Sequence, residues 1–145
     1  MYSEIKLRKL IIRYEGYKDI VYADTLGLPT VGIGHMDKKL TIGTKVSEEQ
    51  IEAYYTDDIK YAIAVAKKAV KDFDGLDEAR QLTLIQLAFN LANKLFQFKD
   101  TLKAIDERDF NKAADCLADS KWYKQVGNRG KETCITLKTG FLFEK

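Results

Sequence analysis

Residues 16–43 read GYKDIVYADTLGLPTVGIGHMDKKLTIG and differ in composition from the rest of the chain. This stretch holds five of the nine glycines and the only proline. Its apolar runs at 20–22 and 30–34 are separated by turn-forming residues around 26–27 and 37–38. Because short apolar runs bounded by glycine, proline and aspartate are typical of hairpins, the stretch predicts a small β-meander.

The sequence on either side of this stretch has helical patterns. Apolar residues recur at helical spacing over 3–14, starting at a serine N-cap. Ser47, followed by two glutamates and a glutamine, forms a capping box that opens a helix to about residue 71. Asp77 caps a helix over 79–90 that is apolar nearly all round, which places it at the centre of a core. Shorter helices are predicted over 100–105, 109–118 and 129–137.

Together these patterns predict an α+β fold in a single domain, residues 1–145. A small β lobe (about 15–46) and a larger helical lobe (about 72–145, with helix 3–14) are joined by the helix over 47–71. We expect a cleft between the two lobes, because such clefts are the usual place for a ligand.

The composition excludes several classes of protein. With 145 residues, 46% of them hydrophobic, the chain can bury a core without disulfides or a structural metal. The formal net charge of +2 argues against a nucleic-acid-binding arm, and no apolar stretch reaches the roughly 20 residues of a membrane span. The first residues lack a secretory signal, so we expect a cytoplasmic protein without stable membrane insertion. Cys116 and Cys134 lack metal-ligand spacing and are expected to be reduced thiols.

Two carboxyl groups border the strands of the predicted meander. Glu15 ends the first helix beside apolar and aromatic residues, and both burial and the negative end of a helix dipole favour a protonated carboxyl. Asp24 lies in a polar turn, where neither influence acts. A glycosidase needs one acid to protonate the leaving oxygen and one carboxylate to stabilise positive charge or activate water. The pair fits that chemistry; the alternative is that both are solvated caps.

The run at 30–34 has two different faces if it is a strand. Valine and isoleucine share one face, whereas Thr30 and the two glycines share the other. A nearly bare face suggests a surface kept open for a bulky ligand. Bulges, or tight packing against a helix, explain the glycines equally well.

Three more polar residues have predicted roles. His35 is the only histidine, so it cannot by itself form a zinc site. Asp58 falls on the apolar stripe of the helix over 47–71, where an unpaired buried carboxylate would be costly. We therefore predict a structural His35–Asp58 pair that ties the β lobe to this helix. Arg129 opens a basic stretch that is either a solvated helix face or the source of a counter-ion for a carboxylate in the cleft.

The order and spacing of these residues resemble the signature of the phage-type lysozymes, glycoside hydrolase family 24. The residues that carry the likeness are Glu15-Gly16, Asp24-Thr25, Gly27 and Thr30-Val31-Gly32-Ile33-Gly34-His35. It continues at Ser47, Phe89-Asn90, Trp122-Tyr123 and Asn128-Arg129. The resemblance covers nearly the whole chain and implies a lysozyme-like fold without a cofactor or metal.

The resemblance also implies an activity, the hydrolysis of the β-1,4 bond between N-acetylmuramic acid and N-acetylglucosamine in peptidoglycan, with inversion. Glu15 is then the general acid, Asp24 the second catalytic carboxylate, and Thr30 the residue that helps to place the attacking water. The other implied positions are the substrate contacts Met36, Phe89, Thr101 and Arg129, of which Arg129 pairs with the acid, and the structural pair His35 and Asp58.

The sequence departs from the family pattern on its helical side. Leu91-Ala92 stand where relatives commonly have glycine after the Phe-Asn pair, and Cys116 stands where a polar substrate contact is expected. Two other functions stay open: a catalytically silent wall-binding or scaffold module, and a lytic transglycosylase, which needs one carboxylate. As a muramidase the protein is expected to be a monomer that depends on a separate holin to reach the bacterial wall.

Overall fold

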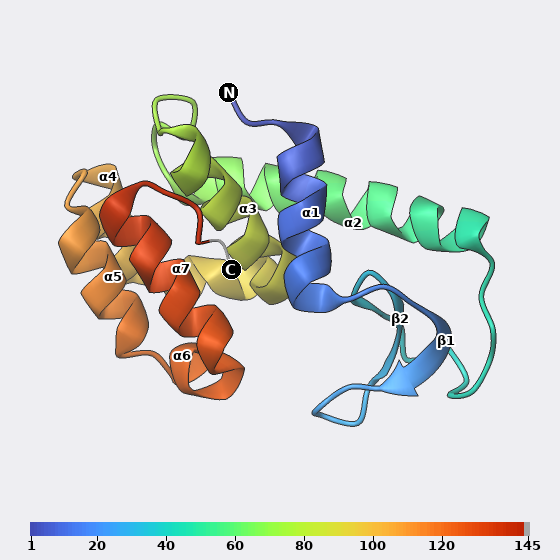
Figure 1. Ribbon diagram of the computed structural model, residues 1–145. Coiled ribbons are helices and arrows are strands. Elements are labelled where there is room, and N and C mark those ends of the chain that lie inside the picture. The colour runs from blue at the N-terminus through green and yellow to red at the C-terminus, as the bar shows by residue number, and fades with distance from the viewer. Residues whose placement is uncertain (144–145) are drawn as a thin grey trace.

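Two helices flank the glycine-rich stretch in the computed structural model, which describes residues 1–143 (Figure 1). Helix α1 (Glu4–Glu15) starts at Ser3, whose side chain accepts a hydrogen bond from the Lys6 amide. Helix α2 (Glu48–Ala69) starts at Ser47, whose Oγ accepts from the Gln50 amide at 3.1 Å. Both predicted N-caps are confirmed, and each satisfies a backbone donor that the first helical turn leaves free.

The stretch between these helices forms a three-stranded antiparallel sheet in the order β1-β2-β3. Its strands are β1 (Lys18–Ala23), β2 (Pro29–Gly32) and β3 (His35–Met36). Tyr22 pairs with Thr30, and Thr30 pairs with Met36. Directly paired residues point to the same face of a sheet, so these three side chains form a row across it.

The glycines of this sheet serve close packing, which favours the second of the two interpretations of the glycine-rich face. β2 ends at Gly32, and a tight turn through Gly34 leads into β3. A Cβ on Gly32 would lie 2.8 Å from Cγ2 of Ile51 on α2, and one on Gly34 would lie 2.6 Å from Oε1 of Glu15. Packing against a helix, the predicted alternative, therefore explains Gly32.

The helical part is built around α3 (Glu78–Leu91). Its middle, residues 81–88, is buried on every side, as its all-round apolar pattern predicts. The elements that follow are η1 (Ala92–Gln97), α4 (Lys99–Asp106), α5 (Phe110–Ala118), α6 (Lys121–Val126) and α7 (Asn128–Thr139). Helices α1, α2 and α7 contact α3 directly, and α5 packs on α7. The 3-10 turn η1 and helix α6 were not predicted.

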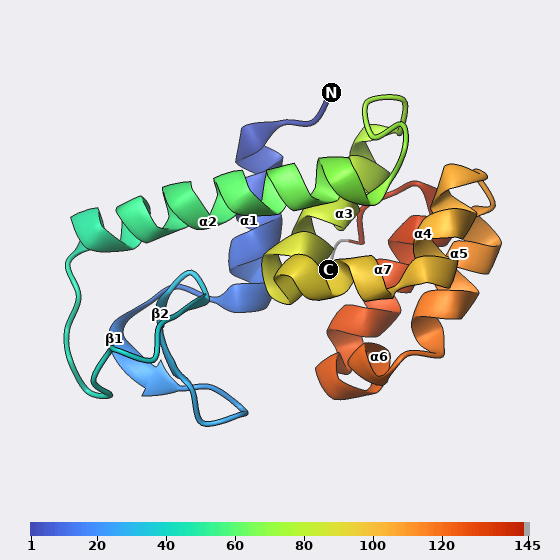
Figure 2. The ribbon, with the colours of Figure 1, turned by 180° about the vertical axis from the view of Figure 1, so that it is seen from behind.

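Helix α2 connects the two parts of the molecule. Figure 2 shows it running from the helical part to a position beside the sheet, while α4 to α7 lie at the opposite end. This arrangement of a small antiparallel sheet and a larger set of helices confirms the predicted α+β class. None of the helices within residues 1–143 has the length and apolar character needed to cross a membrane.

Candidate active site

Glu15 is held in an ion pair at the point where the first and last helices meet. Its Oε2 lies 3.0 Å from Nη2 of Arg129 on α7, and the two side chains are only 14% and 10% exposed. Neither of these atoms has a hydrogen-bond partner among residues 1–143. Each therefore depends on the other for compensation of its charge.

The other oxygen of Glu15, Oε1, lies against Gly34 at the tip of the β2–β3 turn. Gly34 lines a cleft of about 230 Å³ between β3 and the end of α3. Met36 and Phe89, two predicted substrate contacts, line the same cleft. The structure thus brings these two residues together, and Glu15 approaches their cleft through Gly34, which lines it.

His35 and Asp58 lie at the wall of this cleft. His35 Nδ1 lies 2.7 Å from Asp58 Oδ2, and the imidazole ring stacks on Tyr54 with 3.9 Å between the ring centroids. Since an ionised carboxylate only accepts hydrogen bonds, Nδ1 donates. The pair connects β3 to α2, which is the geometry that a tie between the sheet and the long helix requires.

Asp24 and Thr30 are both anchored to the turn that follows β1. Asp24 Oδ1 accepts hydrogen bonds from the amides of Leu26 and Leu28, at 2.8 and 2.9 Å. Thr30, which is 3% exposed, donates its hydroxyl proton to the Leu28 carbonyl at 3.0 Å. One carboxylate oxygen of Asp24 therefore fixes the turn, and within residues 1–143 the other oxygen makes no hydrogen bond, so it can bind water or substrate.

Tyr22 lies within electrostatic range of both carboxylates, and sequence reasoning missed it. Burial raises the pKa of the Tyr22 phenol, and the charges of Glu15 and Asp24 raise it further. Both carboxylates must therefore lie within electrostatic range of this one side chain. The available signal was its position on β1 two residues before Asp24, because alternate residues of a strand share a face.

Thr101, the fourth predicted substrate contact, is not in this cleft. It is 3% exposed and lines a separate pocket of about 370 Å³ between α4 and α5, together with Cys116. No residue that lines this pocket also lines the cleft of Met36 and Phe89. Its role in binding therefore stays a prediction.

A buried polar network lies behind the Glu15–Arg129 pair. Glu132 Oε1 on α7 accepts hydrogen bonds from Arg13 Nη2 at 2.7 Å and from Tyr14 at 2.8 Å. Burial and the hydrogen bond to Glu132 raise the pKa of Tyr14 to about 12. The Tyr14 ring also lies under the guanidinium of Arg129, 4.9 Å from its carbon. Three consecutive residues at the end of α1, Arg13, Tyr14 and Glu15, thus bind to α7.

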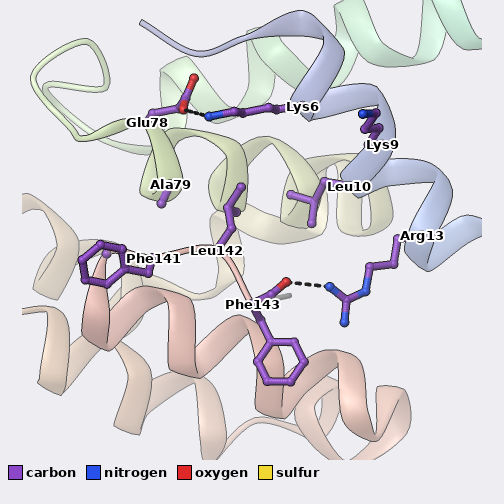
Figure 3. A pocket seen from close by; sticks show the side chains of 10 residues that line it. Lys6, Lys9, Leu10, Arg13, Glu78, Ala79, Phe141, Leu142 and Phe143 are labelled. Atoms are coloured by element: carbon purple, nitrogen blue, oxygen red, sulfur yellow. Dashed lines mark hydrogen bonds and ion pairs between the residues drawn. The ribbon is translucent and has the colours of Figure 1, made fainter. Parts of the chain in front are cut away.

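A pocket of about 510 Å³ lies elsewhere, between α1, the start of α3 and the C-terminal segment (Figure 3). Lys6 pairs with Glu78 there at 3.0 Å, and Arg13 donates to the Phe143 carbonyl at 2.6 Å. None of the predicted site residues lines it. This pocket is therefore separate from the predicted site.

Comparison with known proteins gives consistent matches. A family model described as phage lysozyme matches residues 12–136. The probable T4-type lysozyme 1 of Dictyostelium discoideum is 28% identical, over 92% of this chain and 95% of its own length. An endolysin of Acyrthosiphon pisum secondary endosymbiont phage 1 is 32% identical, over 86% of this chain and 81% of its own. The peptidoglycan hydrolase gp36 of Pseudomonas phage phiKMV is 28% identical, over 86% of this chain but 14% of its own.

Proposed function

Because this chain belongs to the phage lysozyme family, we propose that it is a muramidase that hydrolyses the β-1,4 bond between N-acetylmuramic acid and N-acetylglucosamine. Family membership and the named relatives make it a glycoside hydrolase of peptidoglycan. The bond, the stereochemistry and the roles of individual residues form the proposal. The observation that carries it is the largely buried Glu15, which pairs with Arg129 through one oxygen and lies against Gly34, a residue of the cleft wall, through the other.

Glu15 acts in this proposal as the general acid. Its Oε1 donates the proton to the leaving glycosidic oxygen, while Oε2 stays paired with Nη2 of Arg129. When the proton leaves, the carboxylate that forms already has a guanidinium 3.0 Å away. Charge that develops in the transition state is then met by a group that needs no rearrangement, which is the most effective form of electrostatic stabilisation.

Asp24 and Thr30 act on the side of the water nucleophile. The free oxygen of Asp24 takes a proton from the attacking water as the new bond to the anomeric carbon forms and the glycosidic bond breaks. Thr30 orients that water, and solvent returns the proton from Asp24 to Glu15 for the next cycle. A direct attack of this kind inverts the configuration at the anomeric carbon.

Met36 and Phe89 hold the sugar chain in the cleft, with Met36 half-exposed at its rim. Thr101 and Cys116 lie in the neighbouring pocket, and we propose that this pocket receives a peptide stem of the wall. His35 and Asp58 keep their place as a structural pair, since their 2.7 Å contact fixes β3 on α2.

The endolysin relatives support a proposal about access to the wall. The protein acts from the cytoplasmic side as a monomer, after a separate holin has opened the membrane. Expression in a bacterium with and without a holin tests this, and lysis that is equally fast in both cases contradicts it. Light scattering of the purified protein measures its oligomeric state.

Digestion of purified peptidoglycan followed by mass spectrometry tests the reaction. We expect muropeptides with water-added reducing ends at muramic acid. Glu15→Gln should lower their release about 10²- to 10⁴-fold, the usual contribution of general acid catalysis. Glu107→Gln is the matched control, because Glu107 also lies at the end of a helix but is exposed.

The other candidate functions predict different products. Anhydro-muramic ends would identify a lytic transglycosylase, and binding to the wall without any release would identify a silent module. Near-normal turnover by Glu15→Gln would show that the acid is assigned to the wrong residue.

A further inference from the structure

Gln86 is a buried amide in the central helix of the core. It lies in the middle of α3 and is 2% exposed. Buried polar side chains destabilise a fold unless they are hydrogen-bonded, so the partners of Gln86 indicate what it does.

The partners of Gln86 all belong to α7. Its Oε1 accepts a hydrogen bond from Arg129 Nε at 2.7 Å, and its Nε2 donates to Thr133 Oγ1 at 3.2 Å. Thr133 in turn donates its hydroxyl proton to the Arg129 carbonyl at 2.7 Å. Because that proton is committed, the hydroxyl presents a lone pair to Gln86. The side-chain amide therefore cannot flip, and its oxygen stays toward Arg129.

This contact fixes the guanidinium of Arg129 from a second side. A guanidinium is planar, so holding Nε at one edge determines where Nη2 points. Nη2 lies 3.0 Å from Glu15 Oε2, and the Tyr14 ring supports one face of the plane. Without the Gln86 acceptor, rotation about the side chain could move Nη2 away from Glu15.

We propose that Gln86 is a positioning residue that sets the orientation of Arg129 and, through it, of the acid Glu15. The inference rests on the proposed function, because it assumes that Glu15 donates the proton. Gln86 does not line the substrate cleft. It therefore affects the chemical step and leaves binding of the sugar chain unchanged.

The test compares two methionine variants of buried glutamines on the same helix. Gln86→Met keeps the side-chain length but removes the acceptor for Arg129. Gln81→Met is the control, since Gln81 is 1% exposed and donates to the Phe73 carbonyl at 3.0 Å, away from Arg129. On soluble peptidoglycan oligomers we expect Gln86→Met to lower kcat about 10- to 100-fold with KM unchanged, the effect of losing a hydrogen bond to a charged group. Gln81→Met should lower the Tm but keep kcat.

A double-mutant cycle shows whether Gln86 acts through Arg129. In an Arg129→Lys background, which lacks Nε, Gln86→Met should have no further effect on kcat. An undiminished effect there, or equal kcat losses in the two methionine variants, would overturn the proposal.

If Gln86→Met does not fold, Thr133→Val tests the proposal instead. It frees the amide without changing Gln86 or Arg129, so a severalfold lower kcat with unchanged KM is expected, and an unchanged kcat would overturn the proposal. Failure of the proposed function itself would appear as undiminished activity of Glu15→Gln, which does not depend on Gln86.

Discussion

Replacement of Gly34 by alanine tests whether the β2–β3 turn positions Glu15. The new Cβ would lie 2.6 Å from Glu15 Oε1 and 2.9 Å from its Cβ. Ordinary contacts begin at 3.4 Å, so the carboxylate has to move from 2.6 to 3.4 Å, a shift of about 0.8 Å, unless the turn moves instead. Either movement changes the relation between the acid and the cleft.

The expected magnitudes follow from strain and overpacking. Gly34 has a φ of +62°, where a residue with a Cβ pays about 1–2 kcal/mol. Overpacking adds about 1–3 kcal/mol. Together these lower the free energy of unfolding by about 2–5 kcal/mol and the Tm by roughly 4–20 °C. Since misplacement of a catalytic group by about 1 Å can reduce turnover about 10²-fold, we expect a loss of activity of that order.

Gly43→Ala is the matched control in the same lobe. Gly43 also has a positive φ, +93°, but nothing lies within 4 Å of an added Cβ. This variant should therefore show the smaller loss of Tm and near-normal activity per folded molecule. Calorimetry gives the two Tm values, and initial rates of wall clearing are measured where both variants are folded. If the two variants cleared walls equally fast, the turn would not position Glu15.

Two further predictions concern the supports of the site. Asp58→Asn removes the negative charge from the contact to His35. Because this contact is partly exposed, the loss of unfolding free energy should be only about 1 kcal/mol, and an unchanged Tm would exclude a structural role for the pair. Tyr14 has a pKa raised to about 12 by burial, so its neutral form contributes stability that is complete below pH 10 and is lost as the pH rises to 12. Denaturant titrations at several pH values between 10 and 12 measure the unfolding free energy. Tyr14→Phe should lower the dependence of this free energy on pH by the equivalent of one proton, and the same pH dependence in both proteins would contradict this.

Much of the fold could be predicted because local rules determine it. The N-caps at Ser47 and Asp77 lie next to strong helical periodicity, and the structure uses both. Helix α6 (Lys121–Val126) was missed because six residues are too few for periodicity to show. β2 was predicted to run to Gly34, since alternation of side chains cannot reveal where a strand gives way to a turn.

The site was harder to predict, because its contacts join distant parts of the chain. The sequence pattern singled out Glu15 and Asp24 by their local surroundings. It could not place Gly34 against Glu15, since that approach depends on how the sheet docks on α1. The signal for Gln86 was its place among mostly apolar residues in the middle of α3, because a buried amide there requires partners.

The attachment of α1 to α7 also determines when the protein can become active. Tyr14 and its partner Glu132 are 118 residues apart, and Arg129, the counter-ion of Glu15, comes from the same late helix. During synthesis α1 leaves the ribosome before α7, so Glu15 is made long before its partner Arg129. The order of translation thus delays formation of the Glu15–Arg129 pair until α7 has been made. A ribosome-bound fragment that stops before α7 has Glu15 and Asp24 but lacks Arg129, on which the proposed mechanism depends.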